Sequence, residues 1–284
     1  MNDLEIIIPV YNEEENIAEV LKGIQEVLGS ACRIIVVDDA SQDKTVEVAK
    51  ANGAEVIVHP YNIGNGASIK TGLRQARADV VVLMDGDGQH KPEDIPNLLN
   101  EIDKFDMVIG ARKFSGFSWR NLANIIYNAF ACYVTQFKIE DLTSGFRAVK
   151  REVALKFLYL LPNTFSYPAT LTLAFLKTGR AIKYVPISLS LRKHGKSKIN
   201  LLSDGIRFLL IITRIATFFS PLRVFLPVSV FFFTVGLVYY IYTYLNFHRF
   251  TNMSALLFTT SVIIFMLGLI SEQVSQLRMD RSEE

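Results

Sequence analysis

Two long segments near the end of the chain carry no charged side chain and constrain the fold more than any other feature. Residues 224–248 and 250–271 contain no Lys, Arg, Asp or Glu over 25 and 22 positions. Each run exceeds the roughly 20 residues that a helix needs to cross the hydrocarbon core of a bilayer. Apolar side chains cover every face of both runs, which favours membrane spans over buried helices of a soluble core. We therefore expect a transmembrane hairpin with spans at about 224–245 and 252–272.

Basic residues around the spans predict the orientation of this hairpin. Arg249 is the single arginine or lysine in the short connecting loop. The arginines on the opposite side of the spans are Arg207, Arg214, Arg223, Arg278 and Arg281. Because basic flanks remain in the cytoplasm, we expect both ends of the chain to be cytoplasmic. No signal peptide is expected, since the first residues already have the pattern of a strand. The sequence thus predicts an integral protein of the cytoplasmic membrane.

Composition excludes several classes of function. The chain has 30 Lys+Arg against 28 Asp+Glu, and this net charge of +2 is too small for a protein that coats nucleic acid. We therefore expect no nucleic-acid partner. The two cysteines, Cys32 and Cys132, belong to no CxxC or Cys/His cluster, so neither a disulfide framework nor a structural zinc site is indicated. The residues before the hairpin suffice for one sizeable domain.

Short β-branched runs alternate with amphipathic stretches in the first half of the chain. The expected strands are 4–8, 33–37, 55–59, 80–84 and 107–110, and the expected helices are 14–28, 45–52, 67–76 and 95–103. Continuous apolar strands separated by helices indicate a mostly parallel sheet that is covered on both faces. In such sheets, ligands bind beyond the carboxyl ends of the strands.

Polar residues gather at that edge of the predicted sheet. Four strands are followed by the runs 9–13 (PVYNE), 38–41 (DDAS), 59–62 (HPYN) and 85–90 (DGDGQH). Asn, Asp and Gly favour ordinary turns as well, so each loop alone would be weak evidence. Four such loops at equivalent positions predict one shared crevice.

Asp85 and Asp87 are the residues with the clearest chemistry in this crevice. Two carboxylates separated by one residue, just past a buried strand, can face the same side, and the adjacent glycines let the backbone approach a ligand. Hard oxygen ligands of this kind suit Mg²⁺ or Mn²⁺ shared with substrate phosphates. An EF-hand is excluded, because His90 stands where the loop needs glycine and Pro96 stands where it needs glutamate.

Two nucleotide-binding fingerprints are incomplete. In the run NIGNGA at 62–67, the third glycine of GxGxxG would fall at Ile69, and no GxxxxGK[ST] occurs in the chain. Dinucleotide and P-loop chemistry are therefore disfavoured. The glycine-rich turn still places backbone N–H groups at the start of a helix, where anions bind well.

Seven runs of sequence together resemble family 2 glycosyltransferases with the GT-A fold. They are IPVYNEEENI, VVDDASQDKT, YNIGNGASIKTGL, VVLMDGDGQHKPEDIP, GARK, DLTSGFRAVKREV and RKHGKSK, and they cover about residues 4–200 in order. Within the family they are similar to the polyprenyl-phosphate branch, which includes dolichol-phosphate mannose synthases and bacterial undecaprenyl-phosphate glycosyltransferases.

The resemblance implies an α/β fold: a GT-A, Rossmann-like, mostly parallel sheet with helices on both faces. An interfacial helix and a two-helix transmembrane hairpin would follow. The expected domains are a cytoplasmic catalytic domain at 1–199, an amphipathic juxtamembrane region at 200–222, and the hairpin with a short cytoplasmic tail at 223–284. A homo-oligomer is compatible with this organisation.

The resemblance also implies roles on the donor side. The nucleotide-sugar residues of the family match Pro9, Tyr11, Glu13, Asp39, Asp85 and Arg112. Its metal site matches Asp85, Asp87 and Gln89, which would hold Mg²⁺ or Mn²⁺, with Asp87 and Gln89 the more direct ligands. The expected catalytic residues are Asp87, Asp141 as an orienting carboxylate, and Arg147 near the phosphates. Trp119 and Arg120 have no counterpart that the resemblance assigns.

On the acceptor side, the resemblance implies that Arg192, Ser197 and Lys198 belong to a mobile loop over the acceptor phosphate. A charge count agrees, because 153–203 contains eight cations and no Asp or Glu. A basic surface that adsorbs to anionic lipid would show the same pattern. Apolar residues mixed with Arg207 and Arg214 in 200–220 suit a helix in the membrane interface.

We therefore expect an inverting transfer of a sugar from a nucleotide sugar to undecaprenyl or dolichyl phosphate, with a UDP-sugar favoured and GDP-mannose as the other donor. A lipid monophosphate has a second pKa near ~6, so at neutral pH it is already an anionic nucleophile that hardly needs a general base. A processive polysaccharide synthase is an alternative, but it should carry Gln-x-x-Arg-Trp, and the single tryptophan, Trp119, precedes Arg120. A non-catalytic sugar-nucleotide-binding tether would be expected to lose the two aspartates.

Overall fold

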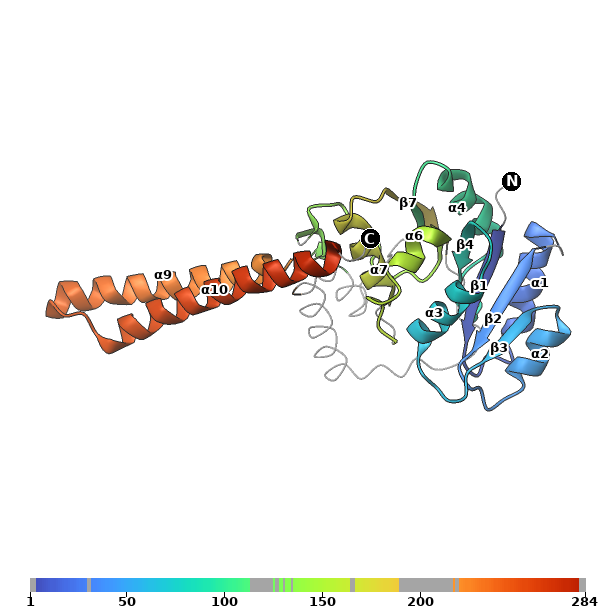
Figure 1. Cartoon of the computed structure of the whole chain (residues 1–284), viewed down its shortest axis with the longest axis horizontal. Helices are drawn as coiled ribbons and strands as arrows, with labels where there is room; N and C mark the ends of the chain where they lie inside the picture. Colours follow the sequence, from blue (N-terminus) through green and yellow to red (C-terminus); the bar gives the residue numbers. More distant parts are fainter. Residues whose placement is uncertain are drawn as a thin grey trace. The chain divides into compact units, whose positions relative to one another are not determined.

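The computed structural model describes residues 4–29, 32–112, 125, 128–129, 131–133, 135–163, 167–188, 217 and 220–280. The chain forms two compact units (Figure 1). The first combines Met1–Ala129 with Phe137–Leu201, and the second combines Phe130–Gln136 with Leu202–Glu284. Each unit is described by itself. The second unit thus includes the short stretch Phe130–Gln136, which the sequence predicts to belong to the catalytic domain.

A sheet in the order β3-β2-β1-β4-β6-β5-β7 forms the centre of the first unit. The strands are β1 (Leu4–Val10), β2 (Arg33–Asp38), β3 (Glu55–Val58), β4 (Val80–Leu83), β5 (Met107–Arg112), β6 (Arg147–Lys150) and β7 (Ile182–Ile187). Only β6 runs antiparallel to its neighbours among the described strands. The mostly parallel sheet confirms the predicted fold class.

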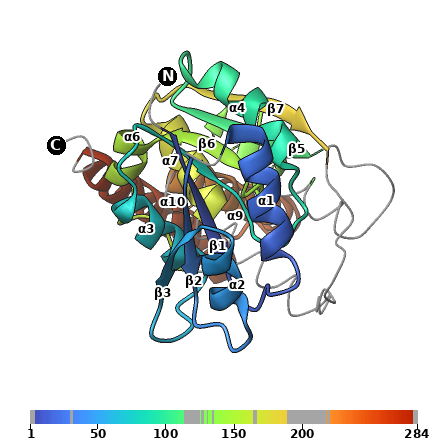
Figure 2. The same ribbon diagram turned by 90° about the vertical axis from the view of Figure 1, so that its right-hand side faces the viewer.

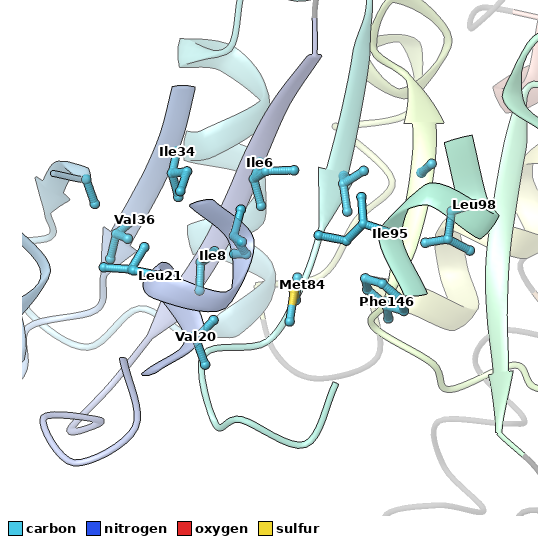
Figure 3. Close-up of a cluster of buried hydrophobic side chains, with 14 of the residues drawn as sticks. Ile6, Ile8, Val20, Leu21, Ile34, Val36, Met84, Ile95, Leu98 and Phe146 are labelled. Atoms are coloured by element: carbon cyan, nitrogen blue, oxygen red, sulfur yellow. The ribbon is translucent and has the colours of Figure 1, made fainter. Parts of the chain in front are cut away.

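Helices cover both faces of this sheet (Figure 2). They are α1 (Ile17–Leu28), α2 (Thr45–Ala51), α3 (Asn65–Gln75), α4 (Ile95–Ile102) after the short turn η1 (Pro92–Asp94), α6 (Arg151–Lys156) and α7 (Tyr167–Lys177). On one face, Ile6 and Ile8 of β1 pack with Leu21 of α1 and Leu98 of α4 (Figure 3). On the other face α3 lies so close that a Cβ at Gly72 would be 2.4 Å from Cγ2 of Ile7. Because alternate residues of a strand point to opposite faces and both faces are covered, β1 is apolar from Ile6 to Val10.

The two predicted membrane spans form a helical hairpin in the second unit. Helices α9 (Pro221–Phe247) and α10 (Asn252–Asp280) are long and apolar enough to cross a bilayer, with mean hydropathies of 2.1 and 2.3 over an 18-residue window in each. The hydroxyl of Ser229 donates to the carbonyl of Ser261, and the hydroxyl of Ser261 donates to the carbonyl of Ser229, both at 2.9 Å. Small polar residues of this kind allow close helix contact in membranes. The hairpin lies where the sequence predicts it.

The base of the hairpin is held by two further contacts within the second unit. The carboxylate of Glu272 in α10 accepts the N–H of Leu222 at 3.1 Å and so caps the first turn of α9. Arg223 donates to the carbonyl of Tyr133 at 2.9 Å, and the hydroxyl of Tyr133 donates to the carbonyl of Arg223 at 3.2 Å. The predicted interfacial helix at 200–222 falls almost entirely outside the described residues, and its structure stays a prediction.

Candidate functional site

The loops after β1 and β2 are joined by hydrogen bonds at the carboxyl edge of the sheet. The N–H of Asn12 donates to the hydroxyl of Ser41 at 2.9 Å, and the side-chain oxygen of Asn12 accepts the N–H of Gln42 at 2.8 Å. Asn12 and Ala40 both adopt positive φ, at 55° and 64°, so each loop turns sharply. The two loops therefore form one wall of the predicted crevice.

Three predicted donor residues lie on this wall. Pro9 is buried within β1 and pairs with Val37, so it shapes the wall from inside. Tyr11 is 44% exposed, which leaves its ring open to a ligand. Glu13 is partly exposed, and its carboxylate accepts a hydrogen bond from the side-chain amide of Asn16 at 2.7 Å. Of these three residues, Tyr11 therefore offers an exposed aromatic ring on which a nucleobase could stack.

Asp39 occupies a buried position that fixes the loop after β3. Its Oδ1 accepts hydrogen bonds from Nδ1 of His59 at 2.8 Å and from the N–H of Ile63 at 2.9 Å, while Oδ2 accepts the N–H of Gly64 at 2.8 Å. Nε2 of His59 lies 3.0 Å from the hydroxyl of Thr71. The Asp39 side chain is 5% exposed. In this structure Asp39 holds the loop that precedes α3 in place. A direct contact between Asp39 and the nucleoside stays a prediction.

The Asp85–Asp87 turn follows β4 at the middle of the same edge. A Cβ at Gly86 would lie 2.6 Å from Cγ1 of Val10, so the turn can pass this close to β1 only with glycine there. The Asp85 side chain is 34% exposed, and its Oδ2 is 3.6 Å from Nε2 of His90. Oδ1 of Asp87 accepts the N–H of Gln89 at 3.1 Å. The turn thus presents two carboxylates from a rigid strand end.

Electrostatics keep Asp85 ionised. Burial acts to raise the pKa of Asp85, but hydrogen bonding and charge from His90, the charge of Arg112 and a hydrogen bond from Asn65 outweigh it. The pKa of this carboxyl therefore lies below its ordinary value. An ionised carboxylate is the form that binds a cation.

The segment before β6 closes the site from the other side. Because β6 runs antiparallel to β4 and pairs Leu83 with Arg147, the residues before Arg147 lie beside those after Leu83. A Cβ at Gly145 would be 2.7 Å from Oδ2 of Asp85. Glycine at this position is what allows the Asp85 carboxylate to lie against the backbone.

Arg112 and Asp141 meet at the end of β5. Nε of Arg112 is 2.6 Å from Oδ2 of Asp141, and Nη2 is 2.8 Å from Oδ1. Nη2 also donates to the hydroxyl of Thr143. The side chain of Asp141 is 1% exposed and that of Arg112 is 15% exposed. Asp141 therefore holds Arg112 in place, and only Arg112 retains access to a ligand.

Arg147 does not lie where the prediction puts it. Its side chain is fully buried, and its guanidinium donates to the carbonyls of Ser144 and Pro168 and to the hydroxyl of Thr172. Burial lowers the pKa of this guanidinium, although Tyr167 beside it acts to raise it. Direct contact with a substrate phosphate requires an accessible side chain. We therefore correct the predicted role: in this structure Arg147 supports the Ser144–Gly145 backbone from inside the fold.

The structure adds residues that the sequence patterns do not single out for the site. Asn65, His90 and Gly145 contact Asp85, and none has a metal- or nucleotide-binding signature of its own. The sequence feature that could have indicated a role in the site is their position, since each lies in one of the runs that resemble the family. The predicted acceptor residues Arg192, Ser197 and Lys198 lie outside the described residues, as do Trp119 and Arg120.

The donor set around the turn fits a small divalent cation. Asp85, Asp87 and Gln89 offer only oxygen side-chain ligands. In the described part of the chain no cluster of three or more His, Cys, Asp or Glu side chains forms a complete metal cage. Mg²⁺ is commonly held by one or two carboxylates plus substrate phosphates, and this set matches that mode.

Comparison with known proteins identifies the family. The glycosyl transferase family 2 model matches residues 5–158, and the GtrB C-terminal hairpin model matches residues 220–277. An undecaprenyl-phosphate mannosyltransferase from Micrococcus luteus is 30% identical over 68% of this chain and 86% of its own length. A polyprenol monophosphomannose synthase from Mycolicibacterium smegmatis is 30% identical over 69% of this chain and 80% of its own length.

Solved structures agree on the fold. A glucosyl-3-phosphoglycerate synthase from Mycobacterium tuberculosis, solved with Mn²⁺ and UDP-glucose, superposes with a TM-score of 0.61 at 22% identity, over 75% of this chain and 77% of that one. The fold is of the GT-A type, with two carboxylates at the carboxyl edge of its sheet. The chain belongs to glycosyl transferase family 2 and is a glycosyltransferase with a membrane-associated C-terminal hairpin.

Proposed function

We propose that this protein transfers a sugar from a nucleoside diphosphate sugar to a polyprenyl phosphate and so makes a lipid-phosphate-linked monosaccharide. The observation that carries the proposal is the combination of the Asp85–Asp87 turn at the carboxyl edge of a GT-A sheet with the C-terminal hairpin. The named relatives from Micrococcus luteus and Mycolicibacterium smegmatis support a polyprenyl acceptor. A UDP-sugar is the favoured donor and GDP-mannose the alternative.

On the donor side, the exposed ring of Tyr11 would stack on the nucleobase, and Arg112 would face the diphosphate. Asp141 makes this possible by holding the guanidinium at the end of β5. Asp85, Asp87 and Gln89 would hold Mg²⁺ or Mn²⁺. When bound, the cation supplies charge neutralisation for the leaving nucleoside diphosphate.

The acceptor phosphate is an anion that must approach another anion. A lipid monophosphate is already nucleophilic at neutral pH, so the enzyme must mainly orient it and offset repulsion. Arg192, Ser197 and Lys198 would bind it, and its oxygen would attack the anomeric carbon as the nucleoside diphosphate leaves with the bonding electron pair. A single displacement inverts the configuration and requires no covalent enzyme intermediate.

A donor and acceptor panel tests the proposal. The purified protein, in detergent with Mn²⁺, is incubated with labelled UDP- and GDP-sugars and undecaprenyl phosphate. We expect one donor to give a chloroform-soluble product carrying one sugar. A polymeric product would instead indicate the processive synthase, and binding of nucleotide sugar without transfer from any donor would indicate the tether.

Lys198→Ala distinguishes an acceptor clamp from a membrane-adsorbing surface. Loss of a surface cation should weaken liposome binding by ~1 kcal/mol and leave turnover in detergent unchanged. Loss of a clamp should lower acceptor-dependent turnover in detergent at least about tenfold, or roughly 1.4 kcal/mol, with donor affinity kept. Lys156→Ala, at the end of α6, is the matched control and should leave detergent turnover near that of wild type.

The orientation of the hairpin is also part of the proposal. With both ends cytoplasmic, a cysteine introduced by Asn252→Cys in a Cys32→Ser, Cys132→Ser background should react with an impermeant maleimide only from outside the cell. Labelling from the cytoplasmic side alone would reverse the orientation.

A further inference from the structure

His90 lies against Asp85 in a setting that fixes its ring. The side chain is buried, with 6% exposed, and its imidazole stacks on Phe146 with ring centroids 5.1 Å apart and planes at 21°. Phe146 is itself fully buried in the core beside β5, and a Cβ at Gly110 would be 2.9 Å from its ring. The histidine ring therefore rests on a rigid platform that the sheet provides.

The Asp85 carboxylate is confined on several sides. Nε2 of His90 is 3.6 Å from its Oδ2, and the backbone of Gly145 lies against the same oxygen, where a Cβ would be 2.7 Å away. Asn65, the first residue of α3, also favours the charged form of this carboxylate. A separation of 3.6 Å is longer than a hydrogen bond, but a small rotation of the partly exposed Asp85 side chain would bring Oδ2 to hydrogen-bond distance from Nε2.

A purely structural role does not explain an imidazole at position 90. Its Nδ1 is buried and has no hydrogen-bond partner among the described residues. A buried unsatisfied polar atom costs about 1–3 kcal/mol, and a phenyl ring would stack on Phe146 without that cost. His59, the other buried histidine near the crevice, uses both ring nitrogens, on Asp39 and Thr71. The one nitrogen of His90 that has a contact faces Asp85.

We infer that His90 is a positioning residue: Nε2 donates a hydrogen bond to Asp85 and fixes the carboxylate in the rotamer that binds the divalent cation of the donor complex. This inference rests on the proposed metal role of Asp85. Groups that orient a metal ligand typically change metal affinity 10–100-fold when they are removed. His90 does not touch the sugar or the acceptor in this assignment.

Two substitutions separate the ring from its nitrogen. His90→Phe keeps the stack on Phe146 and removes the donor, whereas His90→Gln keeps an N–H donor and removes the ring. The full-length protein in detergent is titrated with Mn²⁺ in the presence of UDP, and of GDP in parallel, with calorimetry as the readout. We expect His90→Phe to raise the half-saturating Mn²⁺ concentration at least about tenfold, and His90→Gln to restore most of the loss.

A neighbouring substitution and a second variant serve as controls. Lys91→Ala changes the exposed neighbour and should match wild type. If His90→Phe fails to fold, Phe146→Leu removes the platform alone and should raise the Mn²⁺ requirement by a smaller factor. An unchanged Mn²⁺ requirement in the folded variants, even with a lower melting temperature, overturns the inference. Metal-independent nucleotide binding by wild type would overturn the proposed metal role first, and the inference with it.

Discussion

Arg112 and Asp141 are 29 positions apart in sequence and form a two-point ion pair, with Nε to Oδ2 at 2.6 Å and Nη2 to Oδ1 at 2.8 Å. Asp141 also accepts the N–H of Thr143 at 3.1 Å. Its carboxylate thus binds both Arg112 at the end of β5 and the backbone of its own segment. The pair joins the end of β5 to the segment that leads into β6. Gly145, which backs Asp85, lies on that segment.

Removing Asp141 should therefore destabilise the first unit. Asp141→Ala leaves the partly buried Arg112 without its carboxylate, and loss of one partner of a buried pair costs about 3 kcal/mol. Chemical denaturation in detergent, followed by far-UV circular dichroism, measures the loss in the free energy of unfolding. Glu140→Ala is the control, because its ion pair with Lys138 is long, at 3.8 Å, and exposed, and should contribute less than about 1 kcal/mol.

Asp141→Asn distinguishes this structural role from the orienting role that the sequence predicts. If Asp141 acts mainly through Arg112, the amide should lower both stability and donor affinity. A variant with wild-type stability, wild-type donor affinity and no turnover would instead support a direct catalytic contact.

Asp43 should make stability depend on pH. Its Oδ1 accepts the N–H of Thr45 at 3.0 Å and its Oδ2 accepts the N–H of Glu14 at 3.2 Å, which ties the loop after β1 to the start of α2. Burial acts to raise the pKa of Asp43, but the hydrogen bond from the Thr45 hydroxyl and the backbone hydrogen bonds outweigh it, and the pKa lies below its ordinary value of 3.8. A carboxyl with a lowered folded pKa stabilises the protein above its unfolded pKa, and the stabilisation is lost as pH falls through the folded pKa.

Asp43→Asn should accordingly lower the free energy of unfolding by about 1 kcal/mol at pH 7, and the difference from wild type should shrink as the pH falls below the unfolded pKa. Denaturation curves at several pH values measure this. Asp103→Asn, at an exposed position after α4, serves as the control. A difference that grows towards acid pH would contradict the assigned sign.

Asp87→Ala tests the cation site through activity. The carboxylate lies in the turn after β4, outside the strands and helices of the first unit, so we expect the variant to fold. Transfer should fall at least about a hundredfold, corresponding to roughly 2.7 kcal/mol, because the leaving diphosphate loses its neutralising charge. Wild-type protein in excess EDTA should lose transfer to a similar extent and recover it with Mn²⁺. Normal turnover in either experiment would remove the metal role.

The sequence predicts the part of the fold that depends on apolar patterning. Strands β1 to β5 are runs of β-branched residues long enough to be recognised, and the turn at Asp85 follows because it ends one of them. Strand β6 escapes the same reasoning, because RAVK is short and polar at both ends. Strand β7 and helices α6 and α7 were likewise not among the expected elements.

The direction of a side chain in such a strand is harder to predict than the strand itself. Arg147 pairs with Leu83 in β4 and faces inward, and a shift of one residue would have turned it outward. Nothing in SGFR specifies that register. The sequence likewise places Asp39 at the correct edge but does not reveal that His59, Ile63 and Gly64 already occupy its carboxylate. Sequence motifs thus locate a site. The hydrogen-bond partners of its residues depend on how distant segments of the chain pair, which the motifs do not contain.

The hairpin offers a symmetric relationship that can be tested directly. Gly236 lies seven positions after Ser229 in α9, and Gly268 lies seven positions after Ser261 in α10. Because the helices run in opposite directions, one glycine lies on each side of the serine pair. A Cβ at Gly236 would be 3.0 Å from Cβ of Leu257, and a Cβ at Gly268 would be 2.8 Å from Cβ of Phe225. Each glycine therefore sets how closely the helices approach.

Gly268→Leu should separate the helices near the serine pair and lower hairpin stability by about 2 kcal/mol, the typical cost of overpacking. Because the hydroxyl oxygens of Ser229 and Ser261 are 3.2 Å apart, the double variant Ser229→Cys, Ser261→Cys should form a disulfide under mild oxidation in a background without Cys32 and Cys132. Adding Gly268→Leu should slow this cross-linking at least about threefold. Leu267→Ile, at a side chain that is 49% exposed, is the matched control and should leave the rate unchanged. Equal cross-linking rates in all three proteins would show that the glycine does not set the helix separation.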